Sequence, residues 1–458
     1  MPTVLVLVDG EHYPPVIRWG LAVARERGYE PVAALLVGGG EKLADGGALD
    51  LGGLPVERIA EPAGSRAGAL AAALERHRPE AVLDLSDEPV LGYRERMELA
   101  AVALVRGVPY VGADFRLDPP PAAGPLPVPA FAVIGTGKRT GKTAIGGTAA
   151  RVAAARGMDP VVVAMGRGGP EAPEVAHAPI DLQTLRDLVR AGRHAASDYL
   201  EDALTANVTT VGARRIGGGL AGAPFATNAA QAADVAVSLG AGIVVLEGSG
   251  AALPPVAWDG AALVAPASLD PEYLRGYLGP YRILRSDLFV LTMGSGPDVG
   301  PEALSALESH IRRLRPDAWF VVTDFVPTPL GDVEGRRVFL ATTASADGAR
   351  AQAAHLQKEH GARVVATSAR LADRAALRAD VEAAGPFDVL ATELKAAAVE
   401  VAAELALERG AGVVFVDNRA VTLSGDGELE DLLGRALELA ARRAAERTAR
   451  RAWGRPGE

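Results

Sequence analysis

Short apolar runs alternate with helix-spaced segments from the start of the chain. The first runs cover residues 4–8, 32–37, 81–85 and 108–111. Between them, residues 15–27 and 95–105 place apolar side chains at helical intervals. Strands that alternate with helices in this way are typical of a parallel sheet covered by helices. The pattern therefore predicts a small parallel α/β domain at the N-terminus.

A stretch dense in proline and glycine, residues 118–129, follows this domain. Such a segment cannot continue a helix or a central strand, because proline lacks the backbone donor and fixes its own φ angle. We therefore expect an N-terminal domain over residues 1–128 and a new domain that begins at residue 129.

Two further sets of apolar runs follow. Residues 129–330 are expected to form one doubly wound sheet, with strands at 131–134, 161–165, 243–246, 288–291 and 319–322. Residues 331–458 are expected to form a C-terminal α/β domain, with strands at 338–340, 364–366, 389–391 and 413–416. Residues 428–451 have helical spacing and many arginines, which is typical of a solvated amphipathic helix. The predicted fold class is α/β throughout.

Composition excludes several kinds of chemistry. The chain has 458 residues, a formal net charge of -10 and 0 cysteines. Its acidity argues against a general nucleic-acid binder, so an anionic ligand would need a local basic cluster. Disulfides, thiolate metal sites and thiol nucleophiles are excluded. No apolar run approaches the roughly 20 residues of a membrane span, and the N-terminus lacks a signal-peptide layout, so we expect a cytoplasmic protein without membrane contact.

A glycine-rich loop follows the run at 131–134 and precedes a helix-spaced segment. Its sequence is Gly135-Thr136-Gly137-Lys138-Arg139-Thr140-Gly141-Lys142-Thr143. The first glycine lies one residue further upstream than in the standard P-loop, so this is a variant of that motif. Backbone amides of the loop would face phosphates, Lys142 would reach the β- and γ-phosphates of ATP, and the Thr143 hydroxyl would bind Mg²⁺. A chance glycine-rich turn is the alternative.

Acidic residues follow two of the expected strands. Glu247 ends the run at 243–246 and precedes Gly248-Ser249-Gly250, the place where P-loop enzymes carry a magnesium ligand. Glu171 follows the run at 161–165, and we expect it to assist with the same metal ion. Either residue could instead cap a turn. Because the carboxyl ends of parallel strands meet at one edge of a sheet, these loops and the P-loop are expected to share a crevice.

Arginines accompany the same loops. Arg167 lies in the Gly166–Pro170 turn, and Arg214 and Arg215 precede three glycines. Guanidinium groups beside a closely approaching backbone suit a multiply charged phosphate compound, although a mobile surface loop is the alternative for 214–222. In the N-terminal domain, Asp9, Glu11, His12 and residues 84–89 form either a second ligand edge or a set of loop caps.

These motifs, in this order, resemble the cyclic 2,3-diphosphoglycerate synthetase family over essentially the whole chain. The segments that carry the resemblance are residues 8–15, 135–143, 166–170, 197–202 and 214–219. More distantly, the long-spaced P-loop and Glu247-Gly248-Ser249-Gly250 are similar to dethiobiotin synthetase, in which a Glu-Gly-Ala-Gly segment holds Mg²⁺. Ser249 replaces the alanine of that segment, a small change that should leave the glutamate in place.

The resemblance implies that ATP and 2,3-bisphosphoglycerate are converted to a cyclic anhydride, ADP and inorganic phosphate. It also implies ATP and Mg²⁺ as cofactors. We expect the substrate phosphates to be bound by Lys138, Arg139, Arg167, Arg214 and Arg215. The expected assembly is a homodimer. Two other functions stay open, namely a P-loop kinase that phosphorylates a small acid without closing a ring, and a nucleotide-dependent switch that responds to a protein partner.

Overall fold

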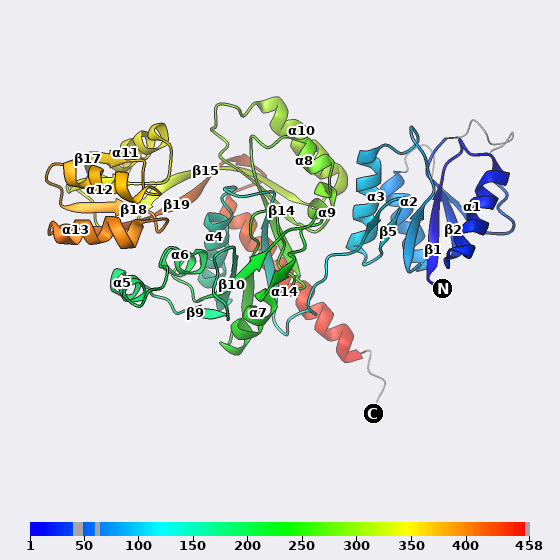
Figure 1. Ribbon diagram of the computed structural model, residues 1–458, viewed down its shortest axis with the longest axis horizontal. Helices are drawn as coiled ribbons and strands as arrows, with labels where there is room; N and C mark the ends of the chain where they lie inside the picture. Colours follow the sequence, from blue (N-terminus) through cyan, green and yellow to red (C-terminus); the bar gives the residue numbers. More distant parts are fainter. Residues whose placement is uncertain (40–48, 60–64, 454–458) are drawn as a thin grey trace. The chain divides into compact units, whose positions relative to one another are not determined.

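The computed structural model describes residues 1–39, 49–59 and 65–453, and the chain forms two compact units (Figure 1). The first unit comprises Met1–Pro121, Leu269–Ser286 and Glu302–Asp317. The second comprises Ala122–Ser268, Asp287–Pro301 and Ala318–Glu458. The first unit thus takes two segments from far along the chain. None of the described helices is long and apolar enough to cross a membrane.

The first unit is built on a sheet whose strand order is β3-β2-β1-β4-β5-β6. In chain order the strands are β1 (Thr3–Val8), β2 (Glu30–Leu36), β3 (Val56–Arg58), β4 (Ala81–Asp84), β5 (Tyr110–Val111) and β6 (Arg116–Leu117). All neighbours pair in parallel except β5 with β6. The predicted parallel α/β domain is therefore confirmed.

Helices from three parts of the chain complete the first unit. They are α1 (Pro14–Glu26), α2 (Arg66–His77), α3 (Tyr93–Val105), α8 (Glu272–Arg275), α9 (Gly279–Leu284) and most of α10 (Pro301–Leu314). Helix α3 packs against both α2 and α9. Because it is covered in this way, its residues 99–104 are all buried.

Two buried aspartates hold the loops at the carboxyl edge of this first sheet. Asp9 accepts hydrogen bonds from the backbone amides of Glu11 at 3.0 Å and Asp87 at 2.7 Å. Asp84 accepts from Arg96 Nε at 3.0 Å and the Tyr110 hydroxyl at 2.8 Å. Their carboxylates are engaged in connecting loops to strands, which favours the loop-capping interpretation of this edge over a second ligand site.

The second unit carries one long sheet with the order β11-β10-β8-β12-β7-β13-β14-β15-β19-β18-β16-β17. Its P-loop part consists of β7 (Ala130–Gly135), β8 (Pro160–Gly166), β10 (Thr210–Ile216), β11 (Ala226–Thr227), β12 (Ile243–Glu247), β13 (Gly260–Pro266) and β14 (Leu288–Thr292). Strand β9 (Glu174–Ala176) pairs with β10 outside this order. The strands from β10 to β15 pair in parallel.

Two long strands connect the P-loop part to the C-terminal part. These are β15 (Trp319–Pro329) and β19 (Gly412–Gly425), which pair antiparallel over most of their length (Figure 1). Beyond them lie β18 (Val389–Thr392), β16 (Arg337–Ala341) and β17 (Arg363–Ser368), with α11 (Ala346–His360), α12 (Arg374–Ala383), η1 (Ala398–Ala403) and α13 (Glu404–Glu408). The α/β fold class predicted for all three parts of the chain is confirmed, while the linear boundaries at residues 128 and 330 stay a prediction.

Helices cover both faces of the P-loop sheet. They are α4 (Lys142–Ala155), α6 (Asp198–Thr205), α7 (Ala229–Ser238) and α14 (Leu429–Trp453), while α5 (Leu182–Arg190) packs against η1. The helix expected over 428–451 is α14, and it is more than a solvated surface helix. Its Leu432, Leu433 and Leu437 are buried in the core that α4 shares with β7 and β12. Burial of each leucine contributes roughly 1.5–3 kcal/mol, so the C-terminal helix stabilises the P-loop sheet.

Candidate active site

The P-loop connects the central strand β7 to α4, as the sequence predicts. Gly141 adopts a φ of 84°, which a residue with a side chain rarely adopts. A Cβ at this position would lie 2.3 Å from Phe325 Cζ. Thr292 donates its hydroxyl to the carbonyl of Thr140 at 2.9 Å. Thr292 of β14 and Phe325 of β15 therefore hold the loop in place, and Phe325 leaves no room for a side chain at position 141.

Lys142 is buried inside the loop. Its Nζ donates to the carbonyl of Gly137 at 2.6 Å and to Thr140 Oγ1 at 3.1 Å. The lysine side chain fills the space where Gly135 would carry a Cβ, 2.7 Å from Lys142 Cδ. Burial lowers the pKa of Lys142 to about 8, although Glu247 and Asp198 oppose the shift. When a nucleotide binds, its phosphate oxygens would replace these two loop acceptors around the ammonium group.

Glu247 ends strand β12 and is buried beside α4. Its Oε1 has no hydrogen-bond partner among the described residues, and neither has either carboxylate oxygen of the buried Asp202. Burial and the negative charge of Asp198 raise the pKa of Glu247, and burial together with Glu247 raises the pKa of Asp202. A buried carboxyl group with an oxygen that lacks a donor is suited to receiving a cation.

Helix α6 supplies the acidic surroundings of Glu247. Asp198, Glu201 and Asp202 are spaced so that they share one face of that helix. From the sequence alone, no role was assigned to the carboxylates of this segment. The signal that was present is the helical spacing of three acids among the apolar residues Tyr199, Leu200 and Ala203. What brings them to Glu247 is the packing of α6 against β8 and β10.

The residues present fit a magnesium ion bound together with ATP phosphates. Among the described residues there is no cluster of three or more acidic or histidine side chains that could hold a metal ion. Mg²⁺ does not need one, because it usually keeps waters and takes one or two carboxylates plus substrate phosphates. The unpartnered Oε1 of Glu247 and the Thr143 hydroxyl at the start of α4 provide that kind of donor set.

Arg167 and Arg215 converge on the turn that follows Glu247. Around the position where Gly250 would carry a Cβ, Arg167 Nη2 lies at 2.8 Å and Arg215 Nη2 at 3.1 Å. Arg215 is held by the carbonyls of Gly217 at 2.7 Å and Ser249 at 2.8 Å. Burial, followed by the charge of Arg167, lowers the pKa of Arg215. After burial, the charges of both arginines also contribute to the lowered pKa of Lys142, so the three cations lie close enough to repel one another.

Arg214 points to a different environment from Arg215 because successive residues of a strand face opposite sides. Its Nε donates to the carbonyls of Gly169 at 3.1 Å and Pro170 at 2.9 Å. Arg214 therefore fixes the loop that follows β8. Its predicted contact with substrate phosphate stays a prediction.

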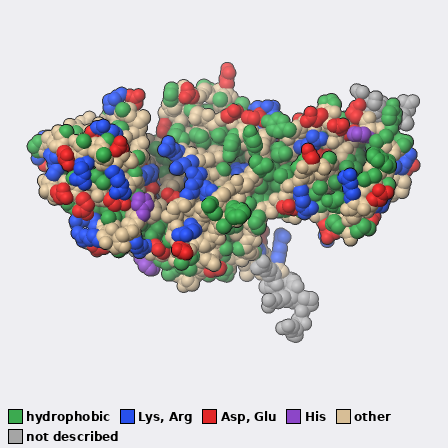
Figure 2. All heavy atoms as spheres, in the orientation of Figure 1, with side chains coloured by type: hydrophobic (Ala, Val, Ile, Leu, Met, Phe, Trp, Pro, Cys, Tyr) green, Lys and Arg blue, Asp and Glu red, His purple; other side chains and the backbone are tan. Residues whose placement is uncertain are grey.

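The remaining predicted residues lie around the same loops. Lys138 and Arg139 are exposed on the P-loop, and Arg139 has a φ of 60°. Figure 2 shows Lys and Arg side chains gathered over the P-loop end of α4. The side chain of Glu171 is exposed, and its backbone carbonyl accepts from Asn228 Nδ2 at 3.1 Å. The carboxylates that interact with Glu247 are those of Asp198, Glu201 and Asp202 instead.

The C-terminal part of the second unit adds a lysine that the sequence did not single out. Lys395 Nζ lies 3.3 Å from Glu201 Oε1 and 3.3 Å from Glu393 Oε2. Although burial lowers it, these carboxylates raise the pKa of Lys395. Burial raises the pKa of Glu201 to about 7, and Lys395 opposes that shift. Lys395 thus connects the C-terminal sheet to the acidic helix α6.

A lysine held inside a glycine-rich loop between a strand and a helix is the arrangement of P-loop proteins, and the second unit belongs to that class. Sequence comparison narrows the class. Family models for cyclic 2,3-diphosphoglycerate synthetase match in three parts, the N-terminal domain at residues 3–118, the P-loop domain at 130–324 and the C-terminal domain at 329–419. The chain therefore belongs to the cyclic 2,3-diphosphoglycerate synthetase family.

Curated relatives agree over nearly the full length. The chain is 46% identical to the cyclic 2,3-diphosphoglycerate synthetase of Rubrobacter xylanophilus, over 93% of this chain and 96% of the relative. It is 41% identical to the enzyme of the same name from Thermococcus kodakarensis, over 96% of this chain and 98% of the relative. It is 39% identical to that from Methanothermobacter thermautotrophicus, over 96% of this chain and 96% of the relative. A solved DUF1611 family protein from Anabaena variabilis shares 16% identity over 80% of this chain and 94% of its own, at a TM-score of 0.18 that supports no inference.

Proposed function

We propose that this protein is an ATP-dependent cyclic 2,3-diphosphoglycerate synthetase. It converts 2,3-bisphosphoglycerate to the cyclic diphosphate and releases ADP and inorganic phosphate. One observation carries the proposal: Lys142, Arg167 and Arg215 converge beside the P-loop, in a chain whose relatives of that name match over at least 93% of its length. Such a cluster suits a ligand with several phosphate groups.

The proposed reaction has two steps, transfer of the γ-phosphoryl group and closure of the ring. An oxygen of one substrate phosphate attacks the γ-phosphorus of ATP, the bond from that phosphorus to the bridging oxygen of ADP breaks, and ADP leaves. An oxygen of the other substrate phosphate then attacks the phosphorus that was activated. The ring bond forms, and the bond to the transferred group breaks so that inorganic phosphate departs with the connecting oxygen.

Ring closure must bring together two phosphates that repel each other, and cationic groups of the second unit would reduce that repulsion. Lys142 and the amides of the P-loop bind the ATP phosphates and stabilise charge on the transferred group. Arg167 and Arg215 neutralise the substrate phosphates and hold them together, which makes the closing step intramolecular. The predicted roles of Lys138, Arg139 and Arg214 in substrate binding belong to the same proposal.

We also propose Mg²⁺ as a cofactor. Thr143 and Glu247 would hold the ion, and Glu171 stays a predicted helper. When bound, Mg²⁺ would neutralise charge on the ATP phosphates. The support from this chain is the buried Glu247 carboxylate with an unpartnered oxygen, which would otherwise carry an unfavourable burial cost.

Phosphorus NMR of the product tests the proposed function. Purified protein incubated with ATP, Mg²⁺ and 2,3-bisphosphoglycerate should produce the resonances of a cyclic anhydride together with ADP and phosphate. An open-chain phosphorylated product would support the kinase alternative and defeat ring closure. ATP hydrolysis that ignores 2,3-bisphosphoglycerate but responds to a protein partner would support the switch alternative.

The expected homodimer and the cytoplasmic location form the last part of the proposal. Exposed apolar side chains often mark interaction surfaces, and the hairpin of β10 and β11 exposes Ile216 by 68% and Phe225 by 90%. A requirement for ATP fits the interior of the cell. Light scattering during size-exclusion chromatography should give twice the chain mass of 47.1 kDa, and a monomer mass would contradict the dimer.

A further inference from the structure

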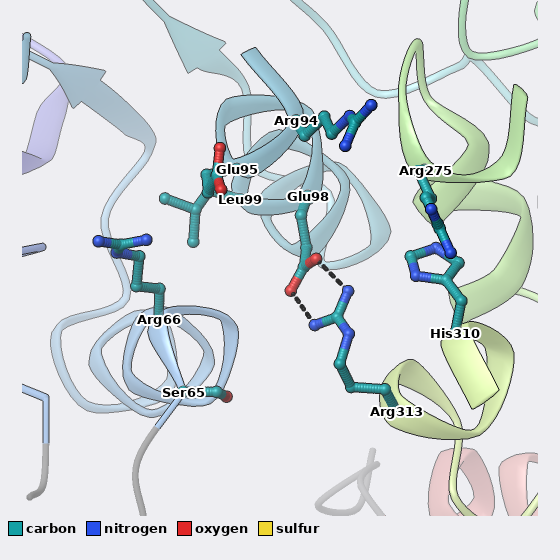
Figure 3. Close-up of a pocket in the computed structure, with 9 residues that line it drawn as sticks. All are labelled: Ser65, Arg66, Arg94, Glu95, Glu98, Leu99, Arg275, His310 and Arg313. Atoms are coloured by element: carbon teal, nitrogen blue, oxygen red, sulfur yellow. Dashed lines mark hydrogen bonds and ion pairs between the residues drawn. The ribbon is translucent and has the colours of Figure 1, made fainter. Parts of the chain in front are cut away.

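The first unit contains a basic cavity that the proposed reaction does not use. It has a volume of about 330 Å³ and is lined by Ser65, Arg66, Arg94, Glu95, Glu98, Leu99, Arg275, His310 and Arg313 (Figure 3). None of these residues belongs to the P-loop or to the carboxyl and guanidinium groups around it. Four arginines against two glutamates give the lining a positive balance in a protein whose net charge is -10.

The cavity joins segments that are far apart in the sequence. Arg66 begins α2, Glu98 lies in α3, Arg275 ends α8, and His310 and Arg313 lie one turn apart in α10. Figure 3 shows Arg66 on one side and Arg275 with His310 on the other. Cations therefore approach the same space from different elements, which is the geometry of a site that surrounds an anion rather than of a single charged helix face.

Ion pairs account for only some of the arginines. Arg313 makes two hydrogen bonds to Glu98, at 2.9 and 2.6 Å, and Arg94 Nη2 lies 2.6 Å from Glu272. These pairs fix α3 against α10 and α8. Arg66 donates its Nε to the carbonyl of Val37 at 2.7 Å. Within the described part of the chain, neither its Nη groups nor the guanidinium group of Arg275 has a hydrogen-bond or ion-pair partner.

We propose that this cavity binds phosphate groups, presented either by a small phosphorylated acid or by free inorganic phosphate. Planar guanidinium groups with unused donors match phosphate oxygens. The volume lies at the low end of the roughly 300–1,000 Å³ of ligand pockets, which suits a small metabolite better than a whole nucleotide. A purely structural network, the competing explanation, would account for Arg66 Nε but would not need the remaining guanidinium donors of Arg66 and Arg275.

His310 provides a local reporter. Its Nε2 lies 3.2 Å from the carbonyl of Leu274, so the ring is oriented beside the arginines. Burial, with smaller contributions from Arg313 and Arg275, lowers the pKa of His310, while the Leu274 carbonyl opposes the shift. An anion placed between these arginines would offset their charge and raise the imidazole pKa. Arg66, Arg94, Glu95, Glu98, Arg275 and Arg313 are the charged groups that line the cavity with it.

The experiment is histidine NMR of the full chain, titrated separately with inorganic phosphate and with 2,3-bisphosphoglycerate in the absence of ATP. The proposal predicts that the His310 resonance shifts in a saturable manner and that its pKa rises. Arg275→Gln should weaken the response by about tenfold or more, as the loss of a charged hydrogen bond does. Arg66→Gln should weaken it as well. Arg27→Gln removes the same charge from an exposed site in the same unit and should change nothing.

The two titrations distinguish the source of the phosphate group. A tighter response to 2,3-bisphosphoglycerate supports a phosphorylated acid as the ligand, and an equal or tighter response to inorganic phosphate supports free phosphate. No shift with either anion overturns the proposal, as does a shift that is equally strong in both cavity variants. Because no ATP is present and no product is measured, either result is independent of whether the protein closes the ring.

Discussion

Gly146 in α4 lies directly against the carboxylate of Glu247 at the end of β12. A Cβ on Gly146 would stand 1.6 Å from Glu247 Oε1, far inside van der Waals contact. The absence of a side chain at this one position of the helix is therefore what allows the glutamate to lie beside the P-loop. A helix glycine that costs about 1 kcal/mol relative to alanine is retained here for the geometry of the site.

The first prediction concerns this contact. Gly146→Ala should displace Glu247 and lower the turnover rate by about a hundredfold, since a misplacement of about 1 Å can cost that much. Overpacking should also destabilise the fold by about 1–3 kcal/mol. The neighbouring Gly147→Ala is the control, because its Cβ would meet nothing closer than 3.7 Å. Steady-state kinetics and thermal unfolding check both, and equal activity of the two variants would contradict the packing argument.

The second prediction concerns the P-loop lysine. Lys142→Ala should abolish measurable turnover while the fold persists, because the lost ammonium group contacts the phosphoryl group in transfer. Circular dichroism would show the fold, and phosphate release would show the activity. Lys358→Ala is a suitable control, since Lys358 lies near the exposed end of α11 and, among the residues that the structure describes, forms an ion pair only with Glu359. Near-normal turnover of Lys142→Ala would remove the P-loop from the mechanism.

The third prediction is a pH dependence. Because burial lowers the pKa of Lys142 to about 8, the charged form needed for phosphate binding is present below that pH and is lost above it. The kcat/KM for ATP, which reports the free enzyme, should therefore fall as pH rises through about 8. The decline in kcat should occur at higher pH, because bound phosphates stabilise the ammonium group. A kcat/KM that stays level well above pH 8 would contradict the assignment.

The fold class could be predicted from the sequence because strands and helices leave different patterns of apolar residues. Buried parallel strands read as short apolar runs, and every run expected to be a strand overlaps one, although the run at 108–111 overlaps only the two-residue strand β5. Strands β10 and β13 escaped that pattern. Strand β10 carries Arg214 and Arg215 just before its last residue, Ile216, and arginines beside glycines suggested a loop. Strand β13 is made largely of small residues between Gly260 and Pro266. The fact that α8, α9 and most of α10 belong to the first unit is a long-range property that no local pattern carries.

The same distinction between local signals and long-range packing applies to the residues of the site. The P-loop and the position of Glu247 depend on local strand, turn and helix signals, so the sequence was sufficient to place them. Asp202 comes to Glu247 through the packing of α6 against the sheet, and Lys395 comes to Glu201 through the return of the C-terminal strands. The difference between Arg214 and Arg215 depends on which side of β10 each side chain faces. The sequence did not predict β10 as a strand, so it could not separate the two arginines.

The fourth prediction uses that difference. Arg215→Ala should raise the KM for 2,3-bisphosphoglycerate by about ten- to a hundredfold, because it removes one of three converging cations. Arg214→Ala removes the hydrogen bonds to Gly169 and Pro170, so it should act on the loop and have the smaller effect on KM. Initial rates over a range of substrate concentrations compare the two. A larger effect from Arg214→Ala would show that the substrate cluster is misassigned.

The most direct test of phosphoryl activation follows the oxygen atoms of the released phosphate. The reaction is run in ¹⁸O-labelled water, and mass spectrometry measures the label in inorganic phosphate for each cyclic product formed. If a substrate phosphate accepts the γ-phosphoryl group of ATP and is then attacked by its neighbour, the connecting oxygen comes from the substrate. The account predicts phosphate without solvent oxygen. One solvent oxygen in each released phosphate would show that water, not 2,3-bisphosphoglycerate, attacks ATP, and would contradict it.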